Sequence, residues 1–527
     1  MRGPADFTAA EVLRTLQRKN AMAKMNQVMN VALAVVLLLM SACSVMIDRD
    51  IVQCRTDVDC AKFETGNTAH AVCSQGVCVN SGLGPKGCFS GTPTTTVQYL
   101  NACTTAQSMP FDNCAKLGLC GAGAVLPDPV PPQSATALTA TIKAVAPPTV
   151  KCADAGPNVI YMTGTSDFGP LLKQVTPLLA ANTPPYRAVF MAGTSCGGVN
   201  AVFDPTLALI KDVPGTATKA ANYAYYFDDT GTQISCLLDP AGNVVDIGVS
   251  NLYSTVCNLA YAPGGLIAGY TGPVVTFGFT VPDFSTQTAI SVEAAHIIFG
   301  LGGINPVGPN VSPWIDPMYY SIRNSGAGST ALAAQLIHVP RTAFWGVDRL
   351  STDNIRDSLV QSAQPEESIG ILSIDYADKG RDNLRVLYLQ GEGQIAGFLP
   401  DSTGRSFNKA NVRDGHYPLW GYVHFYTANI NGAPSAAAGA FVMGFSLPKL
   451  DVALVDAMID ASLVPQCAMK VARDTEMGGF IHNPNNYQCG CHFDYRTTGK
   501  TSCTPCTQLN DCPASAPACN YGFCETE

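Results

Sequence analysis

Residues 159–172 read VIYMTGTSDFGPLL, and residues 188–199 read AVFMAGTSCGGV. Each stretch begins with an apolar run of strand length, passes through a loop containing Gly-Thr-Ser, and continues into a segment whose apolar residues have helical spacing. An apolar run and a polar loop return at residues 244–251 (VVDIGVSN). The full order returns at residues 319–337, around RNSGAGST. This repetition predicts an α/β fold whose loops gather at the carboxyl ends of the strands.

The four loops have the chemistry of an anion site. At a helix N-terminus, free backbone N–H groups and the helix dipole attract an anion. Glycine lets the backbone approach a ligand closely, hydroxyl groups add donors, and Arg323 adds a charge-assisted, bidentate donor. Helix caps without a ligand use the same residue types, so four ordinary caps are the alternative interpretation.

In their order along the chain, these loops resemble those of the phosphate-binding proteins of ABC transporters, which have the class II periplasmic-binding fold. The resemblance covers about residues 156–426 and includes ISVEAAHIIFG, SIGILSIDYA and HYPLWGYVHFY. It implies an α/β core of two lobes that close on a ligand by a hinge motion, without a chemical step. The first lobe is expected at residues 156–276, with a return after about Gln394, and the second at residues 277–393.

Carried over position by position, the resemblance implies a ligand site for phosphate or a similar small oxyanion, without a cofactor, a metal or a catalytic residue. The implied ligand-binding residues are Ser166, Asp167, Ser195, Ser250, Asn251, Arg323, Ala327, Gly328 and Ser329. Three depart from the family: Asp167 stands where threonine is usual, Asn251 replaces an aspartate, and Ala327 lacks a hydroxyl. An ionised Asp167 would repel an anion unless it is protonated or turned away, whereas the Asn251 amide can accept or donate.

The N-terminus predicts export. Residues 31–40 (VALAVVLLLM) form an apolar run suited to a signal peptide, and Ser41-Ala42-Cys43 follows it. This order resembles the lipobox of bacterial lipoproteins, in which the cysteine is lipidated, so Cys43 is the predicted lipidation site. An ordinary signal peptide and a signal anchor are the alternatives. The expected location is a bacterial cell envelope, on the periplasmic or the outer-membrane and surface side, with an ABC permease as a possible partner.

Cysteines cluster at both ends of the chain. There are 21, so assigning Cys43 to lipid leaves an even number for disulfides. The spacing of Cys54, Cys60, Cys73 and Cys78 is echoed by Cys506, Cys512, Cys519 and Cys524, which predicts one disulfide-stapled module used twice. A Cys236–Cys257 bridge is plausible from position alone. A zinc site at Cys489, Cys491, His492, Cys503 and Cys506 is a less favoured alternative to disulfides.

Composition and linkers divide the chain further. The predicted divisions are a signal peptide with lipobox (1–43), a cysteine-rich module (44–125), a Pro/Ala/Thr linker (126–155), the binding domain (156–450) and a second cysteine-rich module (451–527). The net charge of −9 argues against a nucleic-acid partner, which needs a basic surface. A small anion is not excluded, because local dipoles and one arginine can hold it.

Two other functions remain open from the sequence. Residues 193–197 (GTSCG) satisfy the nucleophile-elbow pattern of α/β-hydrolases, with Ser195 as nucleophile, Asp375 as acid and His416 or His424 as base. That reading leaves the first Gly-Thr-Ser loop and Arg323 without a role. Alternatively, the cysteine-rich modules bind an extracellular partner and the binding domain is a retained scaffold.

Overall fold

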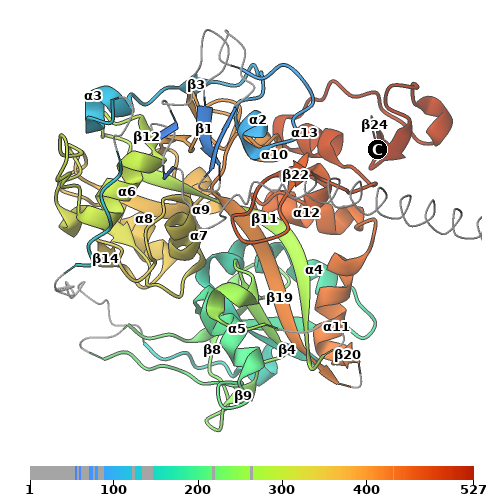
Figure 1. Cartoon of the computed structure of the whole chain (residues 1–527). Coiled ribbons are helices and arrows are strands. Elements are labelled where there is room, and N and C mark those ends of the chain that lie inside the picture. Colours follow the sequence, from blue (N-terminus) through green and yellow to red (C-terminus); the bar gives the residue numbers. More distant parts are fainter. Residues whose placement is uncertain are drawn as a thin grey trace, which may run out of the picture. The chain divides into compact units, whose positions relative to one another are not determined.

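One mixed sheet runs through both lobes of the chain (Figure 1). The computed structural model describes residues 54–55, 59–60, 71–74, 77–80, 88–120, 125–132, 146–216, 220–260, 265–430 and 432–526. Within these residues the sheet has twelve strands. The predicted lipidation site, Cys43, lies outside the described residues.

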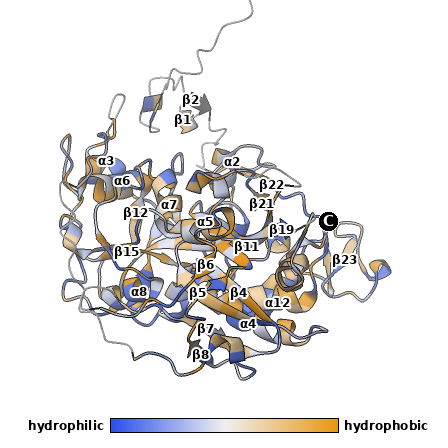
Figure 2. Ribbon diagram, turned by 90° about the horizontal axis from the view of Figure 1, so that it is seen from below, coloured by the Kyte–Doolittle hydropathy of each residue, from blue (hydrophilic) through white to orange (hydrophobic). Residues whose placement is uncertain are grey.

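The first lobe is built on the strands that the sequence predicts. Three parallel strands form its centre, namely β4 (Val159–Thr165), β5 (Arg187–Gly193) and β10 (Ile247–Ser250). Helix α4 (Gly169–Ala180) follows β4, and helix α5 (Ser195–Phe203) follows β5. The strands are apolar on both faces, as expected of parallel strands covered by helices, and Figure 2 shows this hydrophobic interior.

An antiparallel hairpin extends the sheet of the first lobe at its edge. It consists of β7 (Ala224–Phe227), which pairs with β5, and β8 (Gln233–Cys236). The hairpin is formed by the extra residues that separate the second loop from the third in the sequence. Cys236 at its end forms a disulfide with Cys152, which fastens the hairpin to the start of the lobe.

Two long strands join the lobes. Strand β11 (Ile267–Pro282) pairs with β19 (Trp420–Ile430) as far as Thr276, and from Phe277 it pairs with β15 (Ile369–Ser373). The first crossover therefore falls where the sequence predicts it. Together, the sheet order and the two crossover strands give the two-lobed α/β arrangement of class II binding proteins, and the predicted fold class is confirmed.

The return to the first lobe comes later than the expected position after Gln394. Strand β18 (Gly397–Phe398) still pairs with β17 (Tyr388–Gln390) in a separate four-stranded sheet that also contains β12 (Ala289–Ser291). Ladder hydrogen bonds thus keep the chain in the second lobe, and β19 makes the return.

The second lobe repeats the strand–loop–helix order. Strand β13 (Tyr320–Ile322) lies between β15 and β14 (Val347–Asp348), in parallel with both. Its helices are α6 (Val292–Leu301), α7 (Gly328–Leu336), α8 (Thr352–Val360) and α9 (Ile374–Lys379). The ring of Phe299 stacks between those of Phe279 and Phe344, with centroids 5.6 and 5.7 Å away, and anchors α6 in the core.

Segments outside the predicted binding domain share its core. Strand β3 (Ser108–Met109) pairs with β18, and Leu117 of α3 (Asn113–Leu117) is fully buried. At the start of the predicted linker, Val130 donates its N–H to Gly300 and accepts a hydrogen bond from Trp345 at 2.6 Å. The predicted domain boundaries stay a prediction, but these segments are packed against the second lobe.

The C-terminal region adds three helices, α11 (Ala436–Val442), α12 (Val452–Asp460) and α13 (Gly490–Thr498). Helix α12 packs against α4 of the first lobe, and α13 packs against the last hairpin of the chain. No helix among the described residues is long and apolar enough to cross a membrane.

The two cysteine modules have the same disulfide connectivity. In each, the first cysteine pairs with the third and the second with the fourth: Cys54–Cys73 and Cys60–Cys78, Cys506–Cys519 and Cys512–Cys524. The same side-chain contact recurs as well, because Asp59 accepts the N–H of Arg55 and Asp511 accepts that of Thr507. The repeated spacing in the sequence thus corresponds to one repeated local structure.

Other disulfides contradict two interpretations of the sequence, namely the Cys236–Cys257 bridge and the alternative zinc site. Cys236 and Cys257 are not bridged to each other; Cys236 pairs with Cys152, and Cys257 with Cys196. The cysteines of the alternative zinc site are oxidised, in the pairs Cys467–Cys489, Cys491–Cys503 and Cys506–Cys519. A disulfide leaves no thiolate to bind zinc. Ten disulfides thus pair the twenty described cysteines, as an oxidising compartment allows.

Candidate functional site

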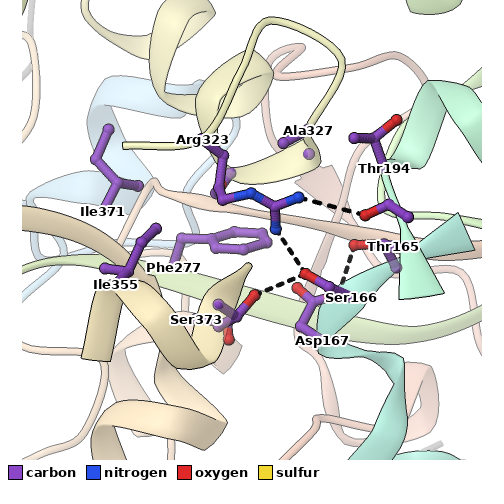
Figure 3. A pocket seen from close by; sticks show the side chains of 14 residues that line it. Thr165, Ser166, Asp167, Thr194, Phe277, Arg323, Ala327, Ile355, Ile371 and Ser373 are labelled. Atoms are coloured by element: carbon purple, nitrogen blue, oxygen red, sulfur yellow. Dashed lines mark hydrogen bonds between the residues drawn. The ribbon is translucent and has the colours of Figure 1, made fainter. Parts of the chain in front are cut away.

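A small cavity lies where the two lobes meet, and its volume of about 10 Å³ is roughly what one water molecule needs (Figure 3). Its walls are the ends of β4 and β5 from the first lobe, and the start of α7 and of α8 from the second. The lining residues are Thr165, Ser166, Asp167, Gly193, Thr194, Phe277, Arg323, Ala327, Gly328, Ser329, Thr352, Ile355, Ile371 and Ser373. The cavity is thus polar where the loops end and apolar on the side of the second lobe's core.

Arg323 is the only described cation that lines this cavity, and only 5% of the residue is exposed. Its Nη1 donates to Ser166 Oγ at 2.6 Å and its Nη2 to the Gly193 carbonyl at 3.3 Å, both across the lobe interface. Its Nε is buried without a hydrogen-bond partner, and the carboxylate of Asp348 lies 3.9 Å away. Burial lowers the pKa of Arg323. The carboxylates of Asp348 and Asp167 act on this cation without a hydrogen bond to it, so its Nε–H is free to hold a bound anion.

The start of helix α7 faces the same cavity without a side-chain cap. Its N-cap residue is Ala327, which has no side-chain acceptor for the first-turn N–H groups. Helices α5, α6 and α8 are each capped, by Thr194, Ser291 and Ser351 respectively. Because Ala327, Gly328 and Ser329 line the cavity, the positive end of the α7 dipole points into it.

Asp167 also lines the cavity, in contact with Asn251. Thr165 Oγ1 donates to Asp167 Oδ1 at 2.6 Å, and Asn251 Nδ2 donates to both carboxylate oxygens, at 3.0 and 2.8 Å. Burial raises the pKa of Asp167, while these donors and the charge of Arg323 act in the opposite direction. Two of the three residues that depart from the family pattern, Asp167 and Asn251, are therefore direct neighbours.

Six of the nine predicted ligand residues line the cavity, and three lie behind it. Ser195 is fully buried, and its Oγ accepts the N–H of Asn251 at 3.1 Å. Ser250 Oγ exchanges hydrogen bonds with the backbone of Leu252, at 2.9 and 3.0 Å. Gly328 lies against this layer, since a Cβ there would meet Ser195 Oγ at 2.8 Å. Ser195, Ser250 and Asn251 thus support the wall, as the structure places them.

The side chains of Thr194, Thr352 and Ser373 also line the cavity, although none of them is among the predicted ligand residues. Thr352 Oγ1 lies 3.0 Å from Ser166 Oγ, which joins α8 to the first loop. A signal for this residue is present in the sequence, because Ser351-Thr352 begins a helix in the same way as the other loops do.

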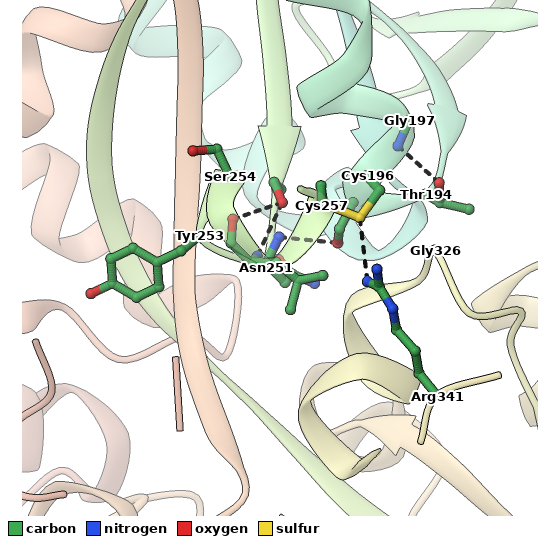
Figure 4. The surroundings of a disulfide bond; sticks show 12 residues. Thr194, Cys196, Gly197, Asn251, Tyr253, Ser254, Cys257, Gly326 and Arg341 are labelled. Atoms are coloured by element: carbon green, nitrogen blue, oxygen red, sulfur yellow. Dashed lines mark hydrogen bonds between the residues drawn. A yellow bond between two sulfur atoms is a disulfide. The ribbon is translucent and has the colours of Figure 1, made fainter. Parts of the chain in front are cut away.

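A disulfide fixes two loops of the first lobe beside the cavity (Figure 4). Cys196, next to Ser195, is bonded to Cys257, which follows the third loop. The Cys196 N–H donates to the carbonyl of Gly326 at 3.1 Å, and this hydrogen bond crosses from the first lobe to the second. The lobes are therefore in contact on both sides of Thr194.

The residues of the hydrolase alternative do not assemble into a triad. His416 Nε2 bonds to the Ala102 carbonyl at 2.8 Å, and His424 packs on the ring of Tyr253. Burial lowers the pKa of His424 to about 3, which makes it a poor base at neutral pH. Among the described residues, no histidine is hydrogen-bonded to Ser195.

Because of the buried carboxyl of Asp375, we expect the free energy of unfolding to depend on pH. Burial, and then the charge of Asp167, raise the pKa of this carboxyl to about 7. The folded state therefore binds the proton more tightly than the unfolded state, so the free energy of unfolding falls as the pH rises from about 4 through 7. Asp375→Asn removes this titration, and we expect it to gain about 2–3 kcal/mol over wild type between pH 5 and pH 8. Urea unfolding at both pH values measures it, with exposed Asp382→Asn as the control.

No protein-family model matches the chain, and no curated protein matches it. Solved structures match over 58% of the chain. They include an ABC-type phosphate transport receptor from Vibrio cholerae (12% identity, 99% of that chain, TM-score 0.36) and a human phosphate binding apolipoprotein (13%, 90%, TM-score 0.38). A phosphate-binding protein from Stenotrophomonas maltophilia matches with 11% identity over 90% of its length and a TM-score of 0.36. These similarities are distant.

Proposed function

We propose that the chain binds phosphate or a similarly small oxyanion between its lobes and performs no chemical step. The observation that carries this proposal is the convergence of Arg323 and the uncapped start of α7 on one small cavity. A buried guanidinium with an unpaired Nε–H and a helix N-terminus are two donors of the kind that hold an oxyanion. The cavity is small in this structure, so a tetrahedral anion would enter it by an opening of the lobes, and a larger ligand would require a wider one.

We further propose that the protein is an exported lipoprotein of a bacterial cell envelope. The disulfides of the described residues support export, and they use all cysteines except Cys43, which the lipobox pattern assigns to lipid. In bacterial lipoproteins an aspartate after the lipidated cysteine favours the inner membrane, and here that residue is Ser44. Ser44 therefore does not require retention at the inner membrane, and an outer-membrane or surface location is as compatible with the sequence as an inner-membrane location beside an ABC permease.

Isothermal titration calorimetry of the full chain with phosphate, arsenate and sulfate tests the binding function. We expect heat of binding for phosphate, and a 1:1 stoichiometry because the proposal places one anion between Arg323 and the start of α7. Binding should also raise the thermal unfolding midpoint, since the ligand binds only the folded state. Absence of binding for all three anions would refute the proposal.

Ser195→Ala separates the binding protein from the hydrolase. Ser195 Oγ contacts Asn251 and does not line the cavity. We therefore expect phosphate affinity to weaken by less than about fivefold, and stability to fall by about 1–3 kcal/mol because the Asn251 N–H loses its acceptor. Calorimetry and a chromogenic ester assay on both proteins measure this. Ester hydrolysis by wild type that disappears in Ser195→Ala would support the hydrolase instead.

A further inference from the structure

The contact between Asp167 and Asn251 places a carboxyl–amide pair in the wall of the cavity. In the structure the amide is the donor, because Nδ2 faces both oxygens of Asp167 and also donates to Thr165 Oγ1 at 3.0 Å. The other polar atom, Asn251 Oδ1, is buried and has no hydrogen-bond partner. The Nδ2 side of the Asn251 amide thus has hydrogen-bond acceptors, whereas its Oδ1 side has no donor.

This arrangement has a second state. A half-turn of the amide exchanges its oxygen and nitrogen, and then Oδ1 can accept hydrogen bonds from a neutral Asp167 and from the Thr165 hydroxyl. The half-turn breaks no hydrogen bond on the far side, since Oδ1 makes none there, but it moves the N–H groups of Nδ2 to that buried position, which costs free energy. The Asn251 side chain therefore accommodates Asp167 in either protonation state, which an aspartate or a valine at position 251 would not do.

The two states present different chemistry to a ligand. An ionised Asp167 beside Arg323 can only accept, so it attracts a ligand O–H and repels a bare oxygen. A neutral Asp167 can donate to a bare oxygen. We propose that the Asp167–Asn251 pair selects oxyanions by their protonation, taking hydrogen-bearing ones when Asp167 is ionised and fully ionised ones, such as sulfate, when it is neutral. This inference rests on the proposed oxyanion-binding function.

The groups around Asp167 influence which of the two states it occupies. The ionisable groups that interact with it are Arg323 from the β13–α7 loop, Asp375 and Tyr376 from α9, and Tyr225 from β7. Burial raises the pKa of Asp167, and only Arg323 among these groups is a cation. A bound anion favours the neutral carboxyl further, because it adds negative charge beside it. Lower pH therefore populates the state that accepts sulfate.

Calorimetry of the full chain with sodium sulfate and with phosphate, at pH 5.5, 7.0 and 8.5, tests the inference. We expect sulfate affinity to rise at least tenfold from pH 8.5 to pH 5.5. In Asp167→Asn, whose amide can donate at every pH, sulfate affinity at pH 8.5 should rise to near the acidic value and lose its pH dependence. Asp348→Asn, which removes a carboxylate near Arg323 but outside the cavity, should keep the wild-type pH dependence.

Each alternative result overturns the inference in a distinguishable way. Sulfate binding that is absent at every pH, while phosphate binds, refutes the selection but leaves the proposed function standing. A pH dependence that survives in Asp167→Asn and disappears in Asp375→Asn assigns the titration to Asp375 instead. If neither anion binds wild type at any pH, the proposed function fails and the inference fails with it. Thermal unfolding of each variant shows whether it is folded.

Discussion

Arg323→Ala is expected to weaken oxyanion binding severely, with an affinity loss of about 30-fold or more. The guanidinium lines the cavity and is nearly fully buried, so no other described cation can replace it there. Removing one partner of a buried, hydrogen-bonded charge pair costs about 2–5 kcal/mol, which corresponds to roughly 30-fold to several thousand-fold in the dissociation constant. Calorimetry with phosphate, or the ligand-induced rise in the unfolding midpoint, measures the loss.

The variant also removes the cation that acts on Asp167 and Asp348, so its thermal unfolding midpoint without ligand is measured to show that it is folded. Arg323→Lys tests the geometry: a single ammonium keeps the charge but loses the planar fork, so we expect it to recover only part of the affinity. Arg385→Ala is a matched control in the same lobe, since Arg385 binds Asp283 and Ser285 away from the cavity. Affinity within threefold of wild type in Arg323→Ala would remove the cavity as the binding site.

The local pattern was sufficient to predict the fold and the meeting of the loops. Apolar runs followed by Gly-Thr-Ser became β4 and β5, each with its helix, because parallel strands place their carboxyl ends at one edge. The resemblance also placed the crossover at Thr276 and Phe277, where the pairing of β11 changes from β19 to β15. These features depend on residues close together in sequence or on the order of motifs.

The local pattern does not predict which hydroxyl groups point into the cavity. Ser166 and Ser195 both follow Gly-x in a Gly-Thr-Ser loop, yet Ser166 lines the cavity and Ser195 lies behind it. The difference arises because Gly328 of the other lobe packs over Ser195, a contact between residues 133 positions apart that no local spacing encodes. The disulfide partners could not be predicted from local spacing either. Cys196 and Cys257 are brought together by the parallel alignment of β4, β5 and β10.

The glycines after the second loop also have a different role from the one inferred. The sequence predicts that these glycines let the backbone approach a ligand closely, but Gly198 lies on the side of α5 that faces the sheet. A Cβ there would meet the Val249 carbonyl oxygen at 2.4 Å and the Gly164 Cα at 2.8 Å. Gly248 faces it, with a Cβ position 2.1 Å from the Gly198 carbonyl oxygen. Three glycines on β4, α5 and β10 thus let the helix backbone pack directly on the strands.

Gly198→Ala is accordingly expected to destabilise the first lobe strongly. The added carbon meets backbone atoms of two strands, which cannot turn aside as a side chain can, so we expect a loss of about 3 kcal/mol or more. Gly197→Ala is the matched control, because this neighbour is exposed, would meet only the Thr194 hydroxyl, at 3.0 Å, and lies in the same helix, where alanine is intrinsically favoured. Urea unfolding of both variants without ligand measures the difference. Equal stability of the two variants would mean that α5 does not pack on the sheet through Gly198. Because α5 begins at Ser195, that result would also contradict the position of the cavity wall behind which Ser195 lies.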